Sequence, residues 1–261
     1  MAPYSKLVTG TDGSDAATDA IAVTGVIAST TGIPVAVVTA WKSSVAVPGA
    51  REQSWADLTA QGADVDLTAL GVTNVELHPL QGNAFDSLVA VANQNDKALI
   101  VVGAAGLDQA SSRLLGSTSN QLSHNSPVDV LFVRRAVERF DTVALATDGS
   151  ATSMRAVRSG LEFARSVGAQ PTLVTAATDT ASGTAMLTDV ADQLAVSGVA
   201  QKILTGNPAD ALVADSGNYD LLVIGNRGMS GLPRVLGSTA NTITHRAASN
   251  LLLVNTASTG D

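Results

Sequence analysis

The stretch LIVVGAAG, at residues 99–106, decides the fold, because it returns as LLVIGNRG at residues 221–228. Both segments pass from an apolar run into a Gly-x-x-Gly turn, which is common where a buried strand leads into a helix. One such turn carries little information, but two near-copies 122 residues apart indicate an internal repeat. The chain therefore contains two related units.

The repeat extends over most of the 261 residues. Three further pairs of segments match: LVTGTDGSDAATDAI (7–21) and VALATDGSATSMRAV (143–157), LQGNAFDSLVAVA (80–92) and LTGNPADALVADS (204–216), and RLLGSTSNQLSH (113–124) and RVLGSTANTITH (234–245). Asp12 and Asp148 are 136 residues apart, whereas Gly116 and Gly237 are 121 apart, so the first copy is longer. We place most of the surplus around residues 43–58, because insertions settle in surface loops and helix ends.

Two tandem domains are predicted, at residues 1–136 and 138–258, with the polar segment RRAVERFD (134–141) as the joint between the two copies. Apolar segments typical of strands alternate with helical ones in both; they lie at 6–11, 35–40, 74–78, 98–102 and 129–133, and at 142–147, 171–176, 200–204, 221–224 and 250–254. Such alternation favours a parallel sheet covered on both faces. The predicted fold class is α/β, with two tandem doubly wound five-stranded parallel-sheet domains in the strand order 3-2-1-4-5.

The composition limits the classes of function. Hydrophobic residues make up 45% of the chain and aromatic residues 3%, so we expect a core of Val, Ala, Leu and Ile. The chain has no cysteine, which excludes disulfides, thiolate nucleophiles and cysteine-bound zinc. The net charge of −8, spread over both halves without a basic cluster, argues against nucleic-acid binding. With no apolar leader and no long apolar run, we expect a cytoplasmic protein that makes no use of a membrane.

One crevice is predicted to join the glycine turn to the first strand. In a sheet of this order, ligands lie beyond the carboxyl ends of the strands, beside strand one. Asp12 follows strand one, and Gly103 follows strand four. The backbone at Gly103 and Gly106 could approach a phosphate closely, and the helix that starts at Gly116 would favour its negative charge. Asp12 would suit a ribose hydroxyl or a divalent cation. A plain strand-to-helix turn is the alternative.

Taken together, these motifs resemble those of the universal stress protein family. They are Asp-Gly-Ser after the first strand, Gly-Asn-x-x-Asp before the third helix, and Gly-x-x-Gly followed by Gly-Ser. The resemblance covers nearly the whole chain in both copies. The chain is similar to two-domain actinobacterial members of the ATP-binding branch. It implies an adenine nucleotide alpha hydrolase-like fold, pairing of the two copies through their fifth strands, and a homodimer.

The same resemblance implies ATP as the ligand, with AMP or cAMP as alternatives. Adenine would lie near the end of strand two, and Mg²⁺ could be held at Asp12 or Asp148 through the bound nucleotide. The residues implied are Asp12, Gly13, Ala40, Trp41, Gly103, Gly106, Arg113, Gly116, Ser117 and Thr118 in the first copy, and Asp148, Gly149, Ala176, Ala177, Gly225, Gly228, Arg234, Gly237, Ser238 and Thr239 in the second. The copies differ in the loop between the second and third glycines, which has nine residues in the first and eight in the second.

Several of these positions also have simpler interpretations. Asn83 and Asn207 precede helices, so we expect them to be N-caps first and ligand contacts second. Arg113 and Arg234 could reach a terminal phosphate or lie solvated on the loop. Trp41 could cover a base, although a single Trp after a strand more often packs.

No catalytic group is expected. We interpret His124 and His245 as structural or surface residues, because they lie two turns into a helix and away from its N-terminus. The sequence has no His-x-x-x-His spacing, no Walker A motif and no Gly-x-Gly-x-x-Gly, so no metal site is expected from the protein alone. The main hypothesis is an ATP-binding stress-response sensor or regulator, at most a slow ATPase. The alternatives are a dimeric scaffold that uses no nucleotide and a cAMP-binding regulator.

Overall fold

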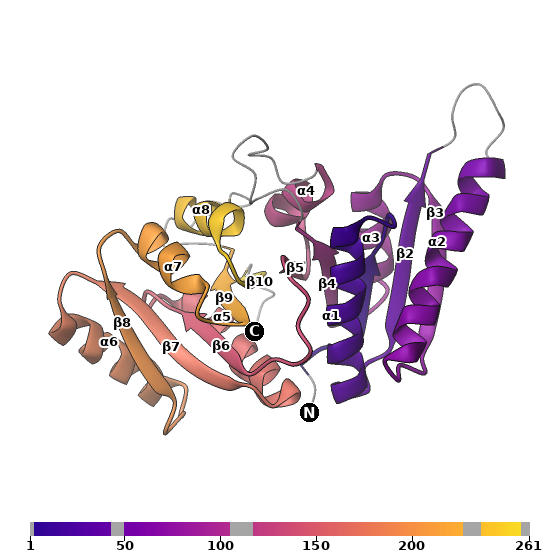
Figure 1. Ribbon diagram of the computed structural model, residues 1–261. Helices are drawn as coiled ribbons and strands as arrows, with labels where there is room; N and C mark the ends of the chain where they lie inside the picture. Colours follow the sequence, from indigo (N-terminus) through magenta and orange to yellow (C-terminus); the bar gives the residue numbers. More distant parts are fainter. Residues whose placement is uncertain (1–2, 43–49, 105–116, 227–235, 257–261) are drawn as a thin grey trace.

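A computed structural model describes residues 3–42, 50–104, 117–226 and 236–256 (Figure 1). The first copy contains β1 (Lys6–Gly10), α1 (Asp15–Thr31), β2 (Val35–Trp41), α2 (Ala50–Ala69), β3 (Val75–Gln81), α3 (Ala84–Ala92), β4 (Ala98–Gly103), α4 (Ser117–Asn125) and β5 (Asp129–Val133). The second contains β6 (Thr142–Ala146), α5 (Ala151–Val167), β7 (Gln170–Ala177), α6 (Thr180–Gln193), β8 (Ala200–Thr205), α7 (Pro208–Ser216), β9 (Leu221–Gly225), α8 (Ser238–Arg246) and β10 (Asn250–Val254). The predicted alternation of strands and helices is confirmed.

The strands of both copies form one ten-stranded sheet, in the order β3-β2-β1-β4-β5-β10-β9-β6-β7-β8. Within each copy the neighbours are parallel and follow the order 3-2-1-4-5, as predicted. The copies meet where β5 and β10 pair antiparallel, with Leu131 opposite Leu252. The predicted pairing through the fifth strands is therefore confirmed within one chain, while a homodimer of two chains stays a prediction.

The strand ends lie within one residue of the prediction, except for the end of the third strand. The third strand was expected to end at residue 78, but β3 continues to Gln81, with Pro79 opposite Thr39. Proline lacks an N–H donor and usually ends a strand, but it is tolerated here because β3 is the outer strand of the sheet. Part of the surplus in the first copy lies in helix α2, which has 20 residues where α6 has 14.

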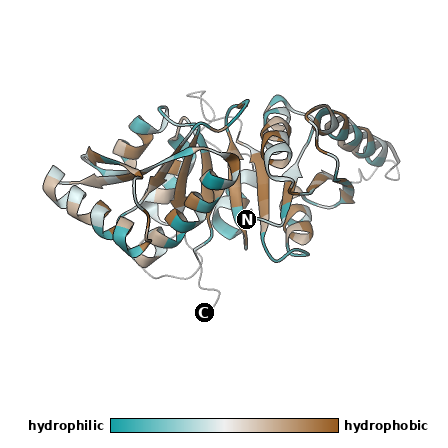
Figure 2. Ribbon diagram, turned by 90° about the horizontal axis from the view of Figure 1, so that it is seen from below, coloured by the Kyte–Doolittle hydropathy of each residue, from teal (hydrophilic) through white to brown (hydrophobic). Residues whose placement is uncertain are grey.

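The core lies on both faces of the sheet. Along β1 and β2, alternate residues enter opposite clusters: Leu7 and Val35 pack on the side of α1, and Val8 and Val38 pack on the side of α3. Figure 2 shows strands that are hydrophobic along their length and helices with hydrophilic residues on their outer surfaces. This burial on two faces explains why the strands are nearly continuous runs of Val, Ile, Leu and Ala.

A pair of equivalent side chains fastens the seam between the copies. Asp129 begins β5 opposite Leu99, and Asn250 begins β10 opposite Leu221 in the matching register. The Asn255 N–H donates to Asp129 Oδ1 at 2.8 Å, and the Arg134 N–H donates to Asn250 Oδ1 at 2.8 Å. Each copy thus accepts a backbone hydrogen bond from the residue that follows the other copy's fifth strand.

Asp129 makes this seam sensitive to pH. Burial raises the pKa of its carboxyl above the ordinary value, although hydrogen bonds from the Asn255 N–H and the Tyr4 hydroxyl oppose the shift. Because the pKa of Asp129 is higher in the folded state than in the unfolded state, protonation of its carboxyl stabilises the folded protein. This contribution is complete below the unfolded-state pKa and is lost as the pH rises through the folded-state pKa. We expect Asp129→Asn, which keeps the Oδ1 acceptor, to raise the free energy of unfolding near neutral pH and to change it little at acid pH. Urea titrations at both pH values check this, and a variant less stable at neutral pH would contradict it.

Candidate functional site

The turn after β1 is fixed by its own side chains. Gly13 has a φ of +75°, a conformation that favours glycine. The Ser14 N–H donates to Asp12 Oδ1 at 3.0 Å, and the Gly13 N–H donates to Thr11 Oγ1 at 3.2 Å. Ser14 also caps α1, because its Oγ accepts from the Ala17 N–H at 3.3 Å. The turn therefore holds Asp12 in one orientation at the end of β1 while its side chain stays exposed.

A cavity of about 300 Å³ lies beyond the carboxyl ends of β1, β2 and β4. Five residues predicted for the site line it: Asp12, Ala40, Gly103, Ser117 and Thr118. The other lining residues are Gly10, Thr11, Ser14, Ala16, Ala17, Val38, Ala84, Leu88, Val102 and Ser119. The strand order thus brings together, in one space, residues that lie more than a hundred positions apart in the sequence.

The two sides of this cavity differ in chemistry. Val38, Leu88 and Val102 are buried and form an apolar wall. Other lining residues carry hydroxyl groups, and Asp12 adds an exposed carboxylate. A ligand with a flat apolar part and a polar or charged part would match both sides.

Helix α4 directs its N-terminus toward the polar side. It begins at Ser117, and the N–H groups of its first turn have no acceptor within the helix. The Ser119 hydroxyl donates to the Gly103 carbonyl at 3.2 Å, which ties the first turn of α4 to the end of β4. N–H groups without an acceptor in the helix and the positive end of the helix dipole make this end a suitable place for an anion.

Packing alone requires a glycine at residue 103, whether or not a ligand binds. A Cβ atom at this position would lie 2.3 Å from the Ala16 carbonyl oxygen in α1. Only glycine therefore lets the first turn of α1 approach the end of β4. The predicted approach of the Gly103 backbone to a phosphate stays a prediction, because the described neighbour is a helix of the same domain.

Other predicted residues of the first copy lie beside the cavity or outside the described residues. Gly13 shapes the turn without lining the cavity, and Trp41 is half-buried at the end of β2, where its carbonyl accepts from the Gly82 N–H at 2.8 Å. A role for Trp41 in covering a base stays a prediction. Gly106, Arg113 and Gly116 lie outside the described residues.

The turn of the second copy is similar in backbone and more heavily bonded. Gly149 has a φ of +76°, and the Ser150 N–H donates to Asp148 Oδ1 at 3.0 Å. The Ser150 hydroxyl also donates to that oxygen, and the Ser153 hydroxyl lies 2.9 Å from Thr147 Oγ1. Burial alone would raise the pKa of Asp148, but hydrogen bonds from Ser150 and Ser153 outweigh it and hold the pKa below the ordinary value. Asp148 is thus already stabilised as an anion by its own helix.

The second crevice carries larger side chains at several equivalent positions. Its predicted residues occupy the expected ends of the elements: Ala176 and Ala177 in β7, Gly225 in β9, Gly237 as the N-cap of α8, and Ser238 and Thr239 in its first turn. At the positions of Gly10, Ala16, Ala17 and Ala84 it has the larger residues Ala146, Thr152, Ser153 and Pro208. Gly228 and Arg234 lie outside the described residues. We therefore regard the first crevice as the better site for a ligand.

Asn83 and Asn207 are confirmed as helix N-caps. Asn83 Oδ1 accepts from the Asp86 N–H at 2.8 Å, and Asn207 Oδ1 accepts from the Ala209 and Asp210 N–H groups at 3.0 and 3.3 Å. Neither residue is among those that line the cavity of the first copy.

We expect Asn83→Ala to lower the free energy of unfolding by about 1 kcal/mol, because the first turn of α3 loses its cap. Chemical denaturation measures this change. Affinity for a ligand of the crevice should stay within twofold of the wild type, since Asn83 faces the helix. A much larger loss of affinity in a folded variant would place Asn83 in the site instead.

The histidines lie away from the crevice, as expected. His124 and His245 are in the last turns of α4 and α8, and burial, followed by the nearby charges of His124 and Arg134, lowers the pKa of His245. Within the described ranges, no group of three or more His, Cys, Asp or Glu residues could hold a metal ion. No helix in those ranges is both long and apolar enough to cross a membrane.

Sequence reasoning missed part of the lining. Thr11 and Ser119 were not singled out, although Thr11 precedes the predicted Asp12 and Ser119 follows Thr118. The signal was available for Ser119, because the first turn of a helix brings adjacent residues to its open end. The apolar wall was not predicted because buried Val and Leu in strands and helices are ordinary core residues.

Comparisons with known proteins agree with this geometry. A family model described as the universal stress protein family matches residues 3–134 and again 139–255. Universal stress protein Rv1636 of Mycobacterium tuberculosis is 33% identical over 149 residues, which are 51% of this chain and 98% of that protein. The match to the family model therefore includes both copies of the repeat.

Solved structures show the same fold. A universal stress protein from Archaeoglobus fulgidus superposes with a TM-score of 0.74 at 19% identity, covering 97% of this chain and 99% of that one. A putative universal stress protein from Pseudomonas aeruginosa gives a TM-score of 0.68 at 15% identity, covering 97% and 93%. A universal stress protein in complex with cAMP is 29% identical over 52% of this chain and all of that one, with a TM-score of 0.45.

Proposed function

This chain belongs to the universal stress protein family, and we propose that its first crevice binds ATP as part of a stress-response sensor or regulator. The observation that carries the proposal is the cavity beyond β1, β2 and β4. It combines an apolar wall, a fixed carboxylate and the N-terminus of a helix, which match the base, the sugar and the phosphates of a nucleotide.

The phosphates fit the start of α4. Its N–H groups and the hydroxyls of Ser117 and Thr118 are donors for phosphate oxygens, and the helix dipole favours the negative charge. Among the described lining residues there is no lysine or arginine, so the backbone would supply most of the binding. The overall negative charge of the protein does not prevent this, because the favourable field is local.

The sugar and the base fit the other two surfaces. Asp12 can accept hydrogen bonds from ribose hydroxyls or bind Mg²⁺ held by the phosphates, because the turn leaves the carboxylate exposed. The base would lie near Ala40 at the end of β2, where Val38 and Leu88 provide apolar contact. The small side chain of Ala40 leaves room for a flat ring.

We propose binding without efficient catalysis. Phosphoryl transfer requires a positioned base or water and cationic groups on the transferred phosphate. The described lining offers hydroxyls and one carboxylate, which the turn holds beside the Ser14 N–H. ATP hydrolysis, if it occurs, should therefore be slow and incidental to binding.

Two alternatives are separable by experiment. cAMP carries the same base and sugar with a single phosphate, so it could use the same walls of a cavity of about 300 Å³. A scaffold that uses no nucleotide would leave the crevice without a ligand. Thermal unfolding with excess Mg-ATP and with excess cAMP distinguishes them, because a ligand at 100 times its dissociation constant adds about 2.7 kcal/mol to stability. Stabilisation by Mg-ATP alone supports the proposal, stabilisation by cAMP alone supports the cyclic nucleotide, and no change with either supports the scaffold.

A further inference from the structure

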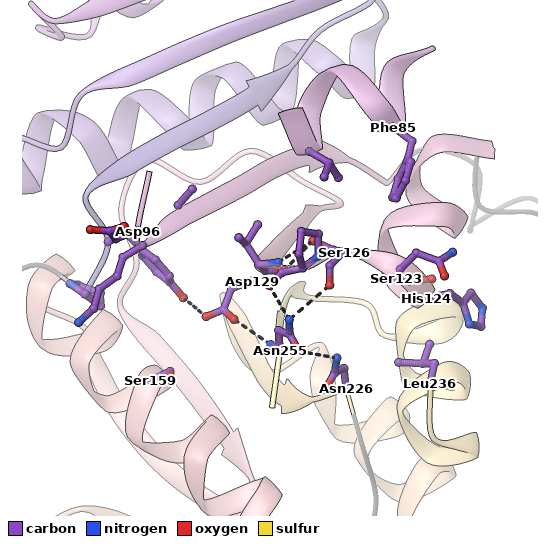
Figure 3. A pocket seen from close by; sticks show the side chains of 18 of the residues that line it. Phe85, Asp96, Ser123, His124, Ser126, Asp129, Ser159, Asn226, Leu236 and Asn255 are labelled. Carbon is purple, nitrogen blue, oxygen red and sulfur yellow. Dashed lines mark hydrogen bonds between the residues drawn. The ribbon is translucent and has the colours of Figure 1, made fainter. Parts of the chain in front are cut away.

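A second cavity, of about 890 Å³, opens at one end of the seam between the two copies (Figure 3). The second cavity is lined by the starts of β4 and β5, the end of α4, parts of α3 and α5, and Asn226, Leu236 and Asn255. None of its lining residues lines the first crevice, so the two cavities are separate. The partly buried carboxylate of Asp129 lies in its wall beside Asn255.

The opposite end of the seam, related by the internal repeat, is filled by two arginines. Arg134 and Arg135 follow β5, and they correspond in register to Asn255 and Thr256 after β10. The Arg134 guanidinium donates to the Thr244 carbonyl. The Arg135 guanidinium donates to the Tyr219 carbonyl at 3.0 Å and lies 3.5 Å from Asp220. Cationic side chains thus occupy one end of the seam.

The open end has no arginine at the matching positions, and of the two matching carbonyls that of Lys97 already accepts from the Ser5 N–H at 2.8 Å, which leaves that of Ser123. Ser123 and Lys97 line the cavity at the positions that correspond to Thr244 and Tyr219. The Ser123 carbonyl lies in the last turn of α4, and its usual donor four residues later would be Pro127, which has no N–H. The negative end of the helix dipole lies at the same place.

Asp129 adds a charge that lacks a cationic partner among the described residues. Its hydrogen bonds come from neutral donors: the Tyr4 hydroxyl at 2.8 Å and the Asn255 N–H at 2.8 Å. None of the ion pairs within the described ranges includes it. At the filled end the equivalent residue is the neutral Asn250. A partly buried carboxylate at the start of a core strand, without an ion pair in the described ranges, favours a bound cation.

We propose that this cavity binds a small organic cation, with a guanidinium or amine head at Asp129 and the end of α4. The head would take the place that an arginine side chain has at the other end of the seam. Phe85, Val89 and Leu236 line the cavity and offer apolar contact for a short alkyl chain. Asp96 and Glu162 also line it, against the single lysine Lys97. The chemistry therefore fits an alkyl guanidine or a polyamine.

Calorimetric titration with agmatine, which has a guanidinium and an amine joined by an alkyl chain, tests this. At constant ionic strength we expect saturable binding and a rise in Tm that an equal concentration of NaCl does not reproduce. Asp129→Asn should weaken binding at least tenfold while the fold is kept. The matched control is Asp96→Asn, which removes an exposed carboxylate from the same cavity and should change affinity less than threefold.

Two more variants separate this site from the others. Asn255→Arg introduces the residue found at the filled end and should abolish agmatine binding. Asp12→Ala, in the proposed nucleotide crevice, should leave agmatine binding unchanged, so failure of the nucleotide proposal would not affect this one. The proposal is overturned if wild-type protein shows neither a binding isotherm nor a rise in Tm, or if Asp129→Asn and Asp96→Asn bind equally.

Discussion

Gly103→Ala is expected to destabilise the protein by about 3 kcal/mol, near the upper end of the usual cost of overpacking. The added Cβ would lie 2.3 Å from the Ala16 carbonyl oxygen, 2.6 Å from its carbon and 2.9 Å from its Cβ. Two of these atoms are backbone, so the clash is relieved only by moving α1 away from β4. Chemical denaturation measures the loss, and a variant as stable as the wild type would contradict the close packing of α1 on β4.

Gly62→Ala is the matched control. Gly62 lies within α2, is exposed, and has no atom within 4 Å of an added Cβ. Glycine inside a helix costs about 0.5–1 kcal/mol relative to alanine. The same chemical change should therefore stabilise the protein at residue 62 and destabilise it at residue 103. Opposite signs for the two variants would show that local space, and not glycine content, decides the effect.

Asp12→Ala is expected to weaken ATP binding at the first crevice by about 10- to 100-fold. A hydrogen bond to a charged group is worth about 1.5–3 kcal/mol, and 1.4 kcal/mol corresponds to a factor of ten. The fold should be kept, because Asp12 is exposed and Ser14 still caps α1. Circular dichroism checks the fold, and isothermal titration measures the affinity.

Asp148→Ala is the comparison that locates this effect. Asp148 occupies the same turn in the second copy, but its carboxylate is already engaged by Ser150, and larger residues surround it. We expect this variant to change ATP affinity less than Asp12→Ala does. Equal losses from both variants would show that the two crevices contribute alike. No loss from Asp12→Ala would remove Asp12 from the site.

Much of the fold could be predicted because the chain repeats itself. The strands at Asp129–Val133 and Asn250–Val254 were predicted to the residue, since both are short apolar runs with clear ends. The extension of β3 past Pro79 was missed, because proline usually ends a strand, although the predicted strand order already places this strand at the edge, where proline is tolerated. Strand order came from the general rule for doubly wound sheets, and tertiary packing decided the exact ends.

The site could be predicted less completely for a physical reason. Motifs identify residues held by turns and helix starts, such as Asp12 and Ser117, because those positions need particular side chains. They do not identify the apolar wall, where Leu88 looks like any core residue. The arginines of the joint were predicted as a polar connection, yet Arg134 and Arg135 bond to carbonyls of the second copy. Such long-range partners leave no local pattern in the sequence.

The central claim is that the first crevice binds an adenine nucleotide. Equilibrium dialysis of the purified chain against Mg-ATP, with bound nucleotide counted per chain, tests it most directly. We predict saturable binding at micromolar nucleotide, with the affinity of the tightest site weakened about 10- to 100-fold in Asp12→Ala and changed less in Asp148→Ala. Absence of bound ATP, AMP and cAMP from the wild-type protein over the same range would contradict the account.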